Sequence, residues 1–201
     1  MRCLLIDFSK AFDTINHAIL FKKLFDLNFS PNITLWIYNF LCGHTQAVLL
    51  GGIISDWKSI TASIVQGSGI GPILFMIYSM DLKPLSDYNK ILKYADDTSL
   101  LVPQHSSVSL EAEFTHISNW SDSNKLKINT DKTKEIIFHR PRLPKKVLPI
   151  PLMGIEQVNC AKILGLTLSD TFSPTQHLNT ILMQCNQRLY LLSQLKYLVK
   201  P

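Results

Sequence analysis

The stretch Tyr94-Ala95-Asp96-Asp97-Thr98 places two adjacent carboxylates between two apolar runs, Ile91-Leu92 and Leu100-Leu101-Val102. This pattern predicts a β-hairpin with the acidic pair at its tip. Two carboxylates held side by side repel each other unless a positive charge lies between them. Hard oxygen ligands of this kind suit Mg²⁺, so the hairpin is a candidate metal site.

A third carboxylate, Asp7, follows the apolar run Cys3-Leu4-Leu5-Ile6, which predicts a second buried strand that ends in an acidic residue. Two strand ends that carry three carboxylates can bind two metal ions about 4 Å apart, an arrangement that supports phosphoryl transfer. The sequence therefore predicts Asp7, Asp96 and Asp97 as ligands of two Mg²⁺ ions.

The composition is that of a folded protein rather than a disordered one, since 46% of the 201 residues are hydrophobic and 17% are charged. The net charge is +5, and the surplus lies in the second half. Residues 1–100 carry 8 basic and 8 acidic residues, and residues 101–201 carry 12 and 7. A basic excess fits a nucleic-acid partner, and it fits equally well a basic protein without one.

The cysteines are widely scattered and show no zinc-binding spacing, which predicts reduced, structural thiols in a nuclear or cytosolic protein: Cys3, Cys42, Cys160 and Cys185. No apolar run approaches the roughly 20 residues of a membrane span. Asp7 interrupts the first apolar stretch too early for a signal peptide. A strand at the very start and Lys200-Pro201 soon after a helical pattern are typical of a piece of a longer protein.

Apolar periodicity and turn residues predict the remaining elements. They are a strand at 2–7, a helix from Asp13-Thr14, a helix from Ser30-Pro31, strands at 46–50 and 57–64, a loop at 67–69, a helix from 71 to about 82, a helix at 107–125, strands at 134–139, 156–160 and 162–168, and a helix from 175. The order predicts an α+β fold with helices packed on one side of an antiparallel, ferredoxin-like sheet.

Five stretches resemble, in order, the catalytic motifs of reverse transcriptases from LINE-type (non-long-terminal-repeat) retrotransposons of the Jockey and chicken-repeat kind. They are Leu5 to Asp13, Gln66 to Pro72, Tyr94 to Thr98, Trp120 to Thr133, and Lys162 to Gly165. The resemblance implies a right-hand polymerase palm over residues 1–174, with truncated fingers, and the start of a thumb helix over residues 175–201. It also implies an RNA-directed DNA polymerase.

The resemblance assigns the catalytic roles. Asp7 and Asp96 would bind both metal ions, and Asp97 would support them. Lys132 would donate a proton or positive charge to leaving pyrophosphate; the alternative is a solvated surface lysine. Asp13 is better interpreted as the cap of the helix that follows it than as another ligand.

The same resemblance assigns four residues to substrate binding: Phe8, Phe12, Gln66 and Gly67. Phe12 matches the position at which a bulky ring blocks a ribose 2′-hydroxyl; the alternative is a core phenylalanine. Gln66 and Gly67 would lie against the incoming nucleotide and template, since glycine lets the backbone approach a ligand closely; the alternative is an ordinary turn. The implied partners are an RNA template, a DNA primer and deoxynucleoside triphosphates, with no membrane, while the oligomeric state stays open.

Other features carry weaker predictions. Trp120 and His17 are predicted to be structural, and the basic loop Arg140 to Lys146 either contacts phosphates or is merely solvated. Val65 and Tyr94 stand where the family usually has Pro and Phe.

Complete fingers, the rest of the thumb, and endonuclease and ribonuclease H motifs are absent from the chain. A retrotransposon relic or a co-opted nucleic-acid-binding fragment is the main alternative, and a group II intron maturase is a third.

Overall fold

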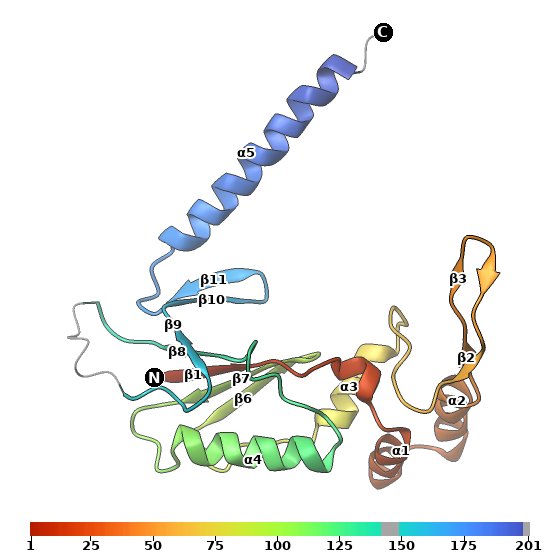
Figure 1. Ribbon diagram of the computed structural model, residues 1–201. Helices are drawn as coiled ribbons and strands as arrows, with labels where there is room; N and C mark the ends of the chain where they lie inside the picture. The colour runs from red at the N-terminus through yellow and green to blue at the C-terminus, as the bar shows by residue number, and fades with distance from the viewer. Residues whose placement is uncertain (142–148, 199–201) are drawn as a thin grey trace.

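The computed structural model describes residues 1–141 and 149–198. In chain order the elements are β1 (Arg2–Ile6), the 3₁₀ helix η1 (Ala11–Thr14), α1 (His17–Asp26), α2 (Pro31–Leu41), β2 (Thr45–Gln46), β3 (Leu49–Leu50), β4 (Ile53–Ile54), β5 (Lys58–Ser59), α3 (Gly71–Ser79), β6 (Lys90–Tyr94), β7 (Asp97–Val102), α4 (Leu110–Ser123), β8 (Lys134–Ile137), β9 (Glu156–Val158), β10 (Cys160–Ile163), β11 (Leu166–Ser169) and α5 (Thr175–Leu198) (Figure 1). Among the described residues, no helix combines the length and apolar character that crossing a lipid bilayer would require.

The central sheet has five strands in the order β6-β7-β1-β8-β9. Three of its pairings are antiparallel, as predicted, and the β8–β9 pairing is parallel. A parallel pair needs a long crossover connection, because the chain must return to the end at which the first strand began. Residues 138–155 connect the two strands here, and residues 142–148 of that connection lie outside the described part.

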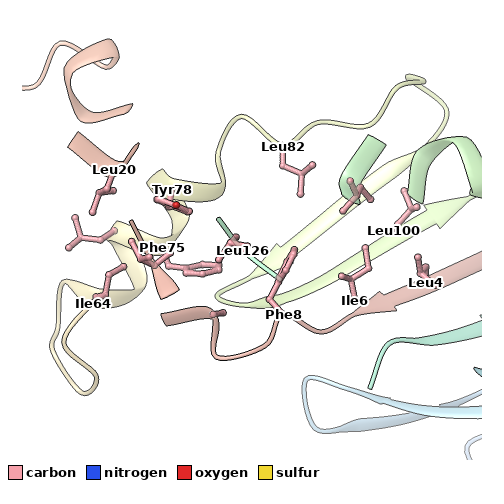
Figure 2. Packing of buried hydrophobic residues seen from close by; sticks show 14 of the residues in the cluster. Leu4, Ile6, Phe8, Leu20, Ile64, Phe75, Tyr78, Leu82, Leu100 and Leu126 are labelled. Atoms are coloured by element: carbon pink, nitrogen blue, oxygen red, sulfur yellow. The ribbon is translucent and has the colours of Figure 1, made fainter. Parts of the chain in front are cut away.

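The two faces of the sheet follow from the alternation of side chains along β1. Leu4 and Ile6 belong to the main hydrophobic core, which includes residues of α4 and continues to α1 and α3. Figure 2 shows this core, with Leu4 and Ile6 at one side and Phe75 and Tyr78 at the other. Cys3 lies in a second cluster on the opposite face, which the β10–β11 hairpin covers (Figure 1). The α+β prediction, with helices on one side of the sheet, is confirmed.

The helix signals are confirmed with one correction. α2 begins at Pro31, a residue favoured in a first turn. α1 is capped by Asn16, whose side-chain oxygen accepts a hydrogen bond from the Ile19 amide at 3.2 Å. The prediction that Asp13 caps this helix is wrong, because Asp13 lies in η1, which ends before α1 begins.

The physical reason is a pairing of residues 12–16 with residues 62–64. The amide of Ile64 donates to Phe12 O at 2.8 Å, and the amide of Ser63 donates to Ile15 O at 3.0 Å. These carbonyls are therefore engaged outside a helix. The same pairing explains why only Lys58–Ser59 of the predicted strand 57–64 is regular.

The predicted strand 46–50 is interrupted. β2 pairs with β5, and β3 pairs with β4 across the turn at Gly51-Gly52. Both glycines have positive φ angles, +57° for Gly51 and +83° for Gly52, which glycine adopts without steric penalty. The two short ladders form the long hairpin that projects beyond α2 in Figure 1.

Candidate functional site

The register of the sheet brings Asp7 and Asp97 together. The last pair of the β1–β7 ladder is Ile6 with Thr98, so the next positions, Asp7 and Asp97, lie opposite each other at the same end of the sheet. Directly opposite residues have Cβ atoms about 4.5–5.5 Å apart and point to the same face. Tyr94 pairs with Asp97 across the neighbouring hairpin, which leaves Ala95 and Asp96 as its turn. Ala95 has a φ of +52° there. The predicted hairpin is confirmed.

The three carboxylates concentrate negative charge. Burial raises the pKa of Asp97 above its ordinary value, and the carboxylates of Asp96 and Asp7 raise it further. None of the ion pairs formed within the described ranges involves Asp7, Asp96 or Asp97. The charge is therefore not neutralised by a side chain of that part of the protein.

This concentration of negative charge fits a divalent cation, although the described side chains supply only part of a ligand set. No group of three or more His, Cys, Asp or Glu side chains within residues 1–141 and 149–198 is arranged to hold a metal ion. Mg²⁺ is usually bound by one or two carboxylates together with water and ligand oxygens, rather than by a complete protein cage. Facing carboxylates such as those of Asp7 and Asp97 match that incomplete donor set.

The backbone of Asp7 is held by the segment that follows α4. Its amide donates to Thr133 Oγ1 at 3.3 Å, and its carbonyl accepts from the Asn129 amide at 2.8 Å. Thr133 is fully buried and donates its hydroxyl to Asn129 O at 2.7 Å. Asn129 and Thr133 belong to the fourth motif of the sequence. The structure shows that they position Asp7, a role that their spacing did not reveal.

A cavity of about 350 Å³ connects this end of the sheet to the β10–β11 hairpin. Asp7, Asp97 and Lys132 line it, together with the segment Lys162-Ile163-Leu164. Lys132 has an exposed side chain, and its amide lies 3.4 Å from Asn129 Oδ1. The first, third, fourth and fifth motifs of the sequence therefore meet around one space, with Asp96 in the adjacent turn.

The residues predicted to bind substrate lie elsewhere. Phe8 is 6% exposed and packs edge-on against Trp120, with ring centroids 6.4 Å apart. Its side chain is part of the core, which leaves only its backbone for a substrate contact. Phe12 is half-buried, and its ring lies 5.0 Å from that of Phe75. This packing is what the alternative interpretation, a core phenylalanine, predicts for Phe12.

Gln66 is exposed, and its Nε2 donates to Asp13 Oδ1 at 2.7 Å. The two residues line a separate cavity of about 260 Å³ beside α2 and β2. Gly67 follows with a φ of +78°, a conformation that favours glycine. Asp13 therefore does not act as the predicted helix cap. Its carboxylate instead orients the Gln66 amide.

The predicted structural residues behave as expected. His17 is 7% exposed, and its Nε2 lies 2.7 Å from Ser63 O. Trp120 packs against Phe8, as core packing requires. Most of the basic loop, residues 142–146, lies outside the described residues. The helix predicted from residue 175 is α5, and residues 199–201 also lie outside the described part.

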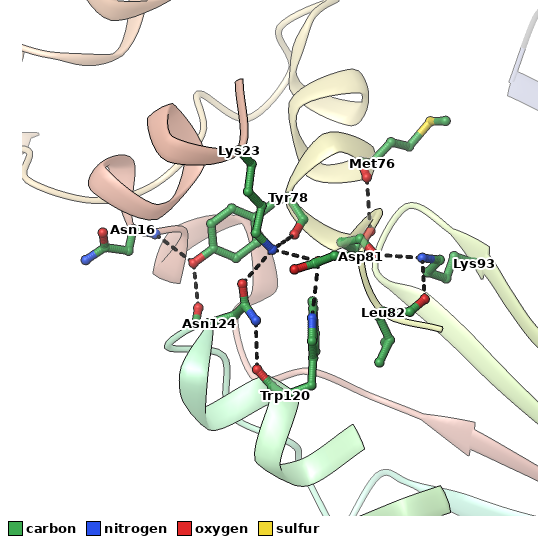
Figure 3. A network of polar contacts seen from close by, with 10 residues as sticks. Asn16, Lys23, Met76, Tyr78, Asp81, Leu82, Lys93, Trp120 and Asn124 are labelled. Atoms are coloured by element: carbon green, nitrogen blue, oxygen red, sulfur yellow. Dashed lines mark hydrogen bonds and ion pairs between the residues drawn. The ribbon is translucent and has the colours of Figure 1, made fainter. Parts of the chain in front are cut away.

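A polar network behind the acidic hairpin has no signature in the sequence (Figure 3). At its centre the Lys23 ammonium donates to Tyr78 O at 2.5 Å and to Asp81 Oδ1 at 2.8 Å. It also donates to Asn124 Oδ1 at 2.6 Å. Burial lowers the pKa of Lys23, and the bond to Asp81 opposes that shift. Trp120 Nε1 reaches the same Asp81 oxygen at 3.2 Å, so the network joins α1, α4 and the end of α3.

Comparison with known protein families and curated proteins gives consistent results. The family model described as "Reverse transcriptase (RNA-dependent DNA polymerase)" matches residues 2–168. A protein of Drosophila melanogaster named "Probable RNA-directed DNA polymerase from transposon BS" is 29% identical over 96% of this chain and 22% of its own length. The "RNA-directed DNA polymerase from mobile element jockey" of the same organism is 27% identical over 88% of this chain and 20% of its own length. The chain thus spans about a fifth of these relatives.

Solved structures with the same fold include telomerases of Candida tropicalis. The apo enzyme truncated from its C-terminal domain has a TM-score of 0.60 and 17% identity, covering 86% of this chain and 34% of that one. The enzyme in complex with a TWJ fragment of telomeric RNA has a TM-score of 0.62 and 16% identity, covering 86% and 29%. At this level of identity the likeness concerns the fold.

Proposed function

Since the chain belongs to the reverse transcriptase (RNA-dependent DNA polymerase) family, we propose that it is the palm of an RNA-directed DNA polymerase from a non-long-terminal-repeat retrotransposon. Residues 1–174 form the palm, and α5 begins the thumb. The observation that carries the proposal is the sheet register. It sets Asp7 opposite Asp97, beside the turn that holds Asp96, at a cavity that Lys132 also lines.

The reaction would extend a DNA primer along an RNA template. The primer 3′-hydroxyl loses its proton to solvent and attacks the α-phosphorus of a deoxynucleoside triphosphate, so that a new P–O bond forms and the bond to the departing pyrophosphate breaks. Asp7 and Asp96 would hold two Mg²⁺ ions, with Asp97 in support. When bound, the ions supply charge neutralisation and a lowered hydroxyl pKa. The raised pKa of Asp97 and the absence of ion pairs to these carboxylates in the described residues support this assignment.

The remaining roles follow the layout of the cavity. Lys132 would place a positive charge, or a proton, at the departing pyrophosphate. Lys162-Ile163-Leu164 line the same cavity and would hold the primer end next to the carboxylates. Gln66, which lines the separate cavity with Asp13, and Gly67, which follows it, would contact the incoming nucleotide and template, with Asp13 fixing the amide of Gln66.

Phe12 would exclude ribonucleotides by contact with the 2′-hydroxyl. Its packing on Phe75 supports a fixed ring position, and its remaining exposed surface is available to a sugar. Replacement Phe12→Ala is expected to raise ribonucleotide incorporation relative to deoxynucleotide incorporation. An unchanged sugar preference in a folded variant would contradict the assignment.

The test uses two proteins. The first is a chimera in which residues 2–168 replace the matching segment of the jockey polymerase, assayed for primer extension on an RNA template with Mg²⁺. We expect activity that Asp96→Asn reduces by about 100-fold or more. The second is the purified chain, in which Mn²⁺ binding measured by electron paramagnetic resonance is expected to weaken in Asp7→Asn. A chimera as inactive as its Asp96→Asn variant, together with no Mn²⁺ binding, would favour a non-catalytic relic.

A further inference from the structure

The acidic turn is carried by an edge strand of the sheet. β6 is one of the two edge strands of the central sheet, next to β7. Its residues Lys90, Leu92, Lys93 and Tyr94 are exposed, so little apolar burial holds it in place. Catalytic groups nevertheless need a fixed position, because misplacement by about 1 Å can reduce a rate by roughly 100-fold. The ladder to β7 holds one side of β6, and its further support comes from outside the apolar core.

Lys93 supplies that support. Its ammonium donates to Ser79 O at 2.6 Å and to Leu82 O at 3.1 Å. Ser79 is the last residue of α3, and the final carbonyls of a helix lack partners within it. A cation is favoured at that end, because the helix dipole places partial negative charge there. Lys93 therefore joins an edge strand to the C-terminal end of a helix (Figure 3).

The position of Lys93 in the sheet ties this contact to the acidic site. Lys93 pairs with Thr98, and Thr98 pairs with Ile6, so the three residues form one row across three strands. The next row contains Asp97 and Asp7. Because side chains alternate between faces, Lys93 points to the helical face while the carboxylates of the next row point to the cavity. Its anchor lies one residue away from the acidic row, on the reverse side of the sheet.

The end of α3 is itself held firmly. Tyr78 is fully buried, and its hydroxyl donates to Asn124 O at 2.5 Å. Asp81 receives bonds from Lys23 on α1 and from Trp120 on α4. The lysine on β6 is therefore attached to a point that three helices share. Burial lowers the pKa of Lys93, Asp81 raises it, and Lys23 and Lys83 lower it, so the ammonium lies partly out of solvent beside these charged groups.

We propose that Lys93 is a positioning residue for the acidic site: its ammonium fastens β6 to the end of α3 and thereby sets the place of the Ala95-Asp96 turn and of Asp97. The activity readout of this inference rests on the proposed polymerase function. The structural readout does not, because it concerns the position of the turn in the purified chain.

The first experiment measures amide hydrogen exchange in the purified chain. Lys93→Met keeps the length of the side chain and removes its donors, and Lys90→Met is the matched control on the same strand. The Lys90 ammonium donates only to Asp87 O among the described residues, at 3.1 Å. We expect exchange over residues 94–98 to be about 10-fold faster in Lys93→Met than in the wild type or in Lys90→Met, with Lys93→Arg close to the wild type.

The second experiment uses the jockey chimera. Lys93→Met is expected to lower kcat by about 10- to 100-fold while the KM for the deoxynucleotide changes by less than about 2-fold, because the triphosphate contacts remain. Lys93→Arg is expected to recover most of kcat, since it retains donors for both carbonyls. A loss shared equally by Lys90→Met would be a general effect on the strand and would overturn the inference.

The two experiments separate the two proposals. If the wild-type chimera is inactive and the purified chain binds no Mn²⁺, the polymerase assignment fails, and hydrogen exchange still decides the role of Lys93. If Lys93→Met unfolds the chain, Lys93→Gln takes its place in the same comparison, since its amide is uncharged and sits on a shorter side chain. Exchange over residues 94–98 no faster than in Lys90→Met, or faster throughout the chain to the same degree, overturns the positioning role.

Discussion

Two hairpins of this protein have similar sequence signals and different surroundings. In the β6–β7 hairpin, Leu100 is fully buried between β1 and the helical layer. In the β3–β4 hairpin, Leu50 and Ile53 are 78% and 77% exposed. Both segments contain apolar residues on either side of a tight turn. The difference shows that the acidic hairpin owes its fixed geometry to the layers around it, since a two-stranded hairpin alone is marginally stable in water.

The contrast extends to the two ends of the chain. Leu4 near the N-terminus is fully buried, whereas Leu178, Leu189 and Leu192 of α5 are 53%, 62% and 62% exposed. Local stability follows the number of buried apolar contacts. We therefore expect the sheet, α1, α3 and α4 to form the cooperative unit that holds the carboxylates. The β3–β4 hairpin and α5 would open more easily.

The largest expected effect tests this contrast directly. Leu100→Ala removes a fully buried side chain from β7 and is expected to lower the free energy of unfolding by about 2–5 kcal/mol. Leu50→Ala in the exposed hairpin is expected to change it by less than about 0.5 kcal/mol. Urea denaturation of both variants measures the difference. Similar losses at the two positions would show that the β3–β4 hairpin is part of the same cooperative core.

The next largest loss of stability is expected in the polar network around Lys23 and Tyr78. Tyr78→Phe removes a fully buried hydroxyl that donates to Asn124 O, and we expect a loss of about 1–3 kcal/mol because a buried carbonyl loses its partner. Tyr190→Phe on α5, where the ring is 64% exposed, is the control and should have almost no effect. Thermal unfolding of the two variants compares them. A neutral Tyr78→Phe would mean that the bond between α3 and the end of α4 adds nothing to the frame.

Sequence reasoning identified those parts of the site that depend on local signals. The apolar runs next to Asp7 and Asp97 predict the two strands that carry these carboxylates. The register that sets these residues opposite each other is a tertiary property. The sequence indicated that the carboxylates could share one metal site, and it did not give their register. Lys23 contacts Asn124 across 101 positions of the chain. No spacing rule predicts such a pair, because it depends on how three helices pack.

The misassigned helix cap shows the same limit. Asp13 and Asn16 are both residue types that favour N-caps, and a local rule cannot choose between them when a segment distant in the sequence pairs with this one. The pairing of residues 62–64 with residues 12–16 delays the start of α1, so Asn16 becomes the cap.

This correction predicts a smaller difference in stability. Asn16→Ala is expected to lower the free energy of unfolding by about 1 kcal/mol, because the Ile19 amide loses its acceptor. Asp13→Ala loses only an exposed bond to Gln66 and should change stability by less than about 0.5 kcal/mol. Chemical denaturation measures both values. A larger loss for Asp13→Ala would restore Asp13 as the residue that determines the start of the helix.

The smallest expected effect has the opposite sign. Burial and the neighbouring carboxylates raise the pKa of Asp97 in the folded protein, so the folded state binds this proton more tightly than the unfolded state does. Stability therefore falls as the pH rises from the unfolded pKa of about 4 through the higher folded value, and the full cost is present at neutral pH.

Asp97→Asn removes that cost. In the absence of divalent cations, the variant should be more stable than the wild type at pH 7, by less than about 1 kcal/mol because solvent screens an exposed carboxylate. The gain should disappear near pH 3, where Asp97 is protonated in both states. Asp56→Asn, which removes one negative charge from the exposed β4–β5 connection, is the control for net charge. Melting temperatures measured between pH 3 and pH 8 in a chelator decide the matter. An Asp97→Asn variant less stable than the wild type at pH 7 would show that the carboxylates do not repel one another. A cation would then not be required to stabilise them side by side.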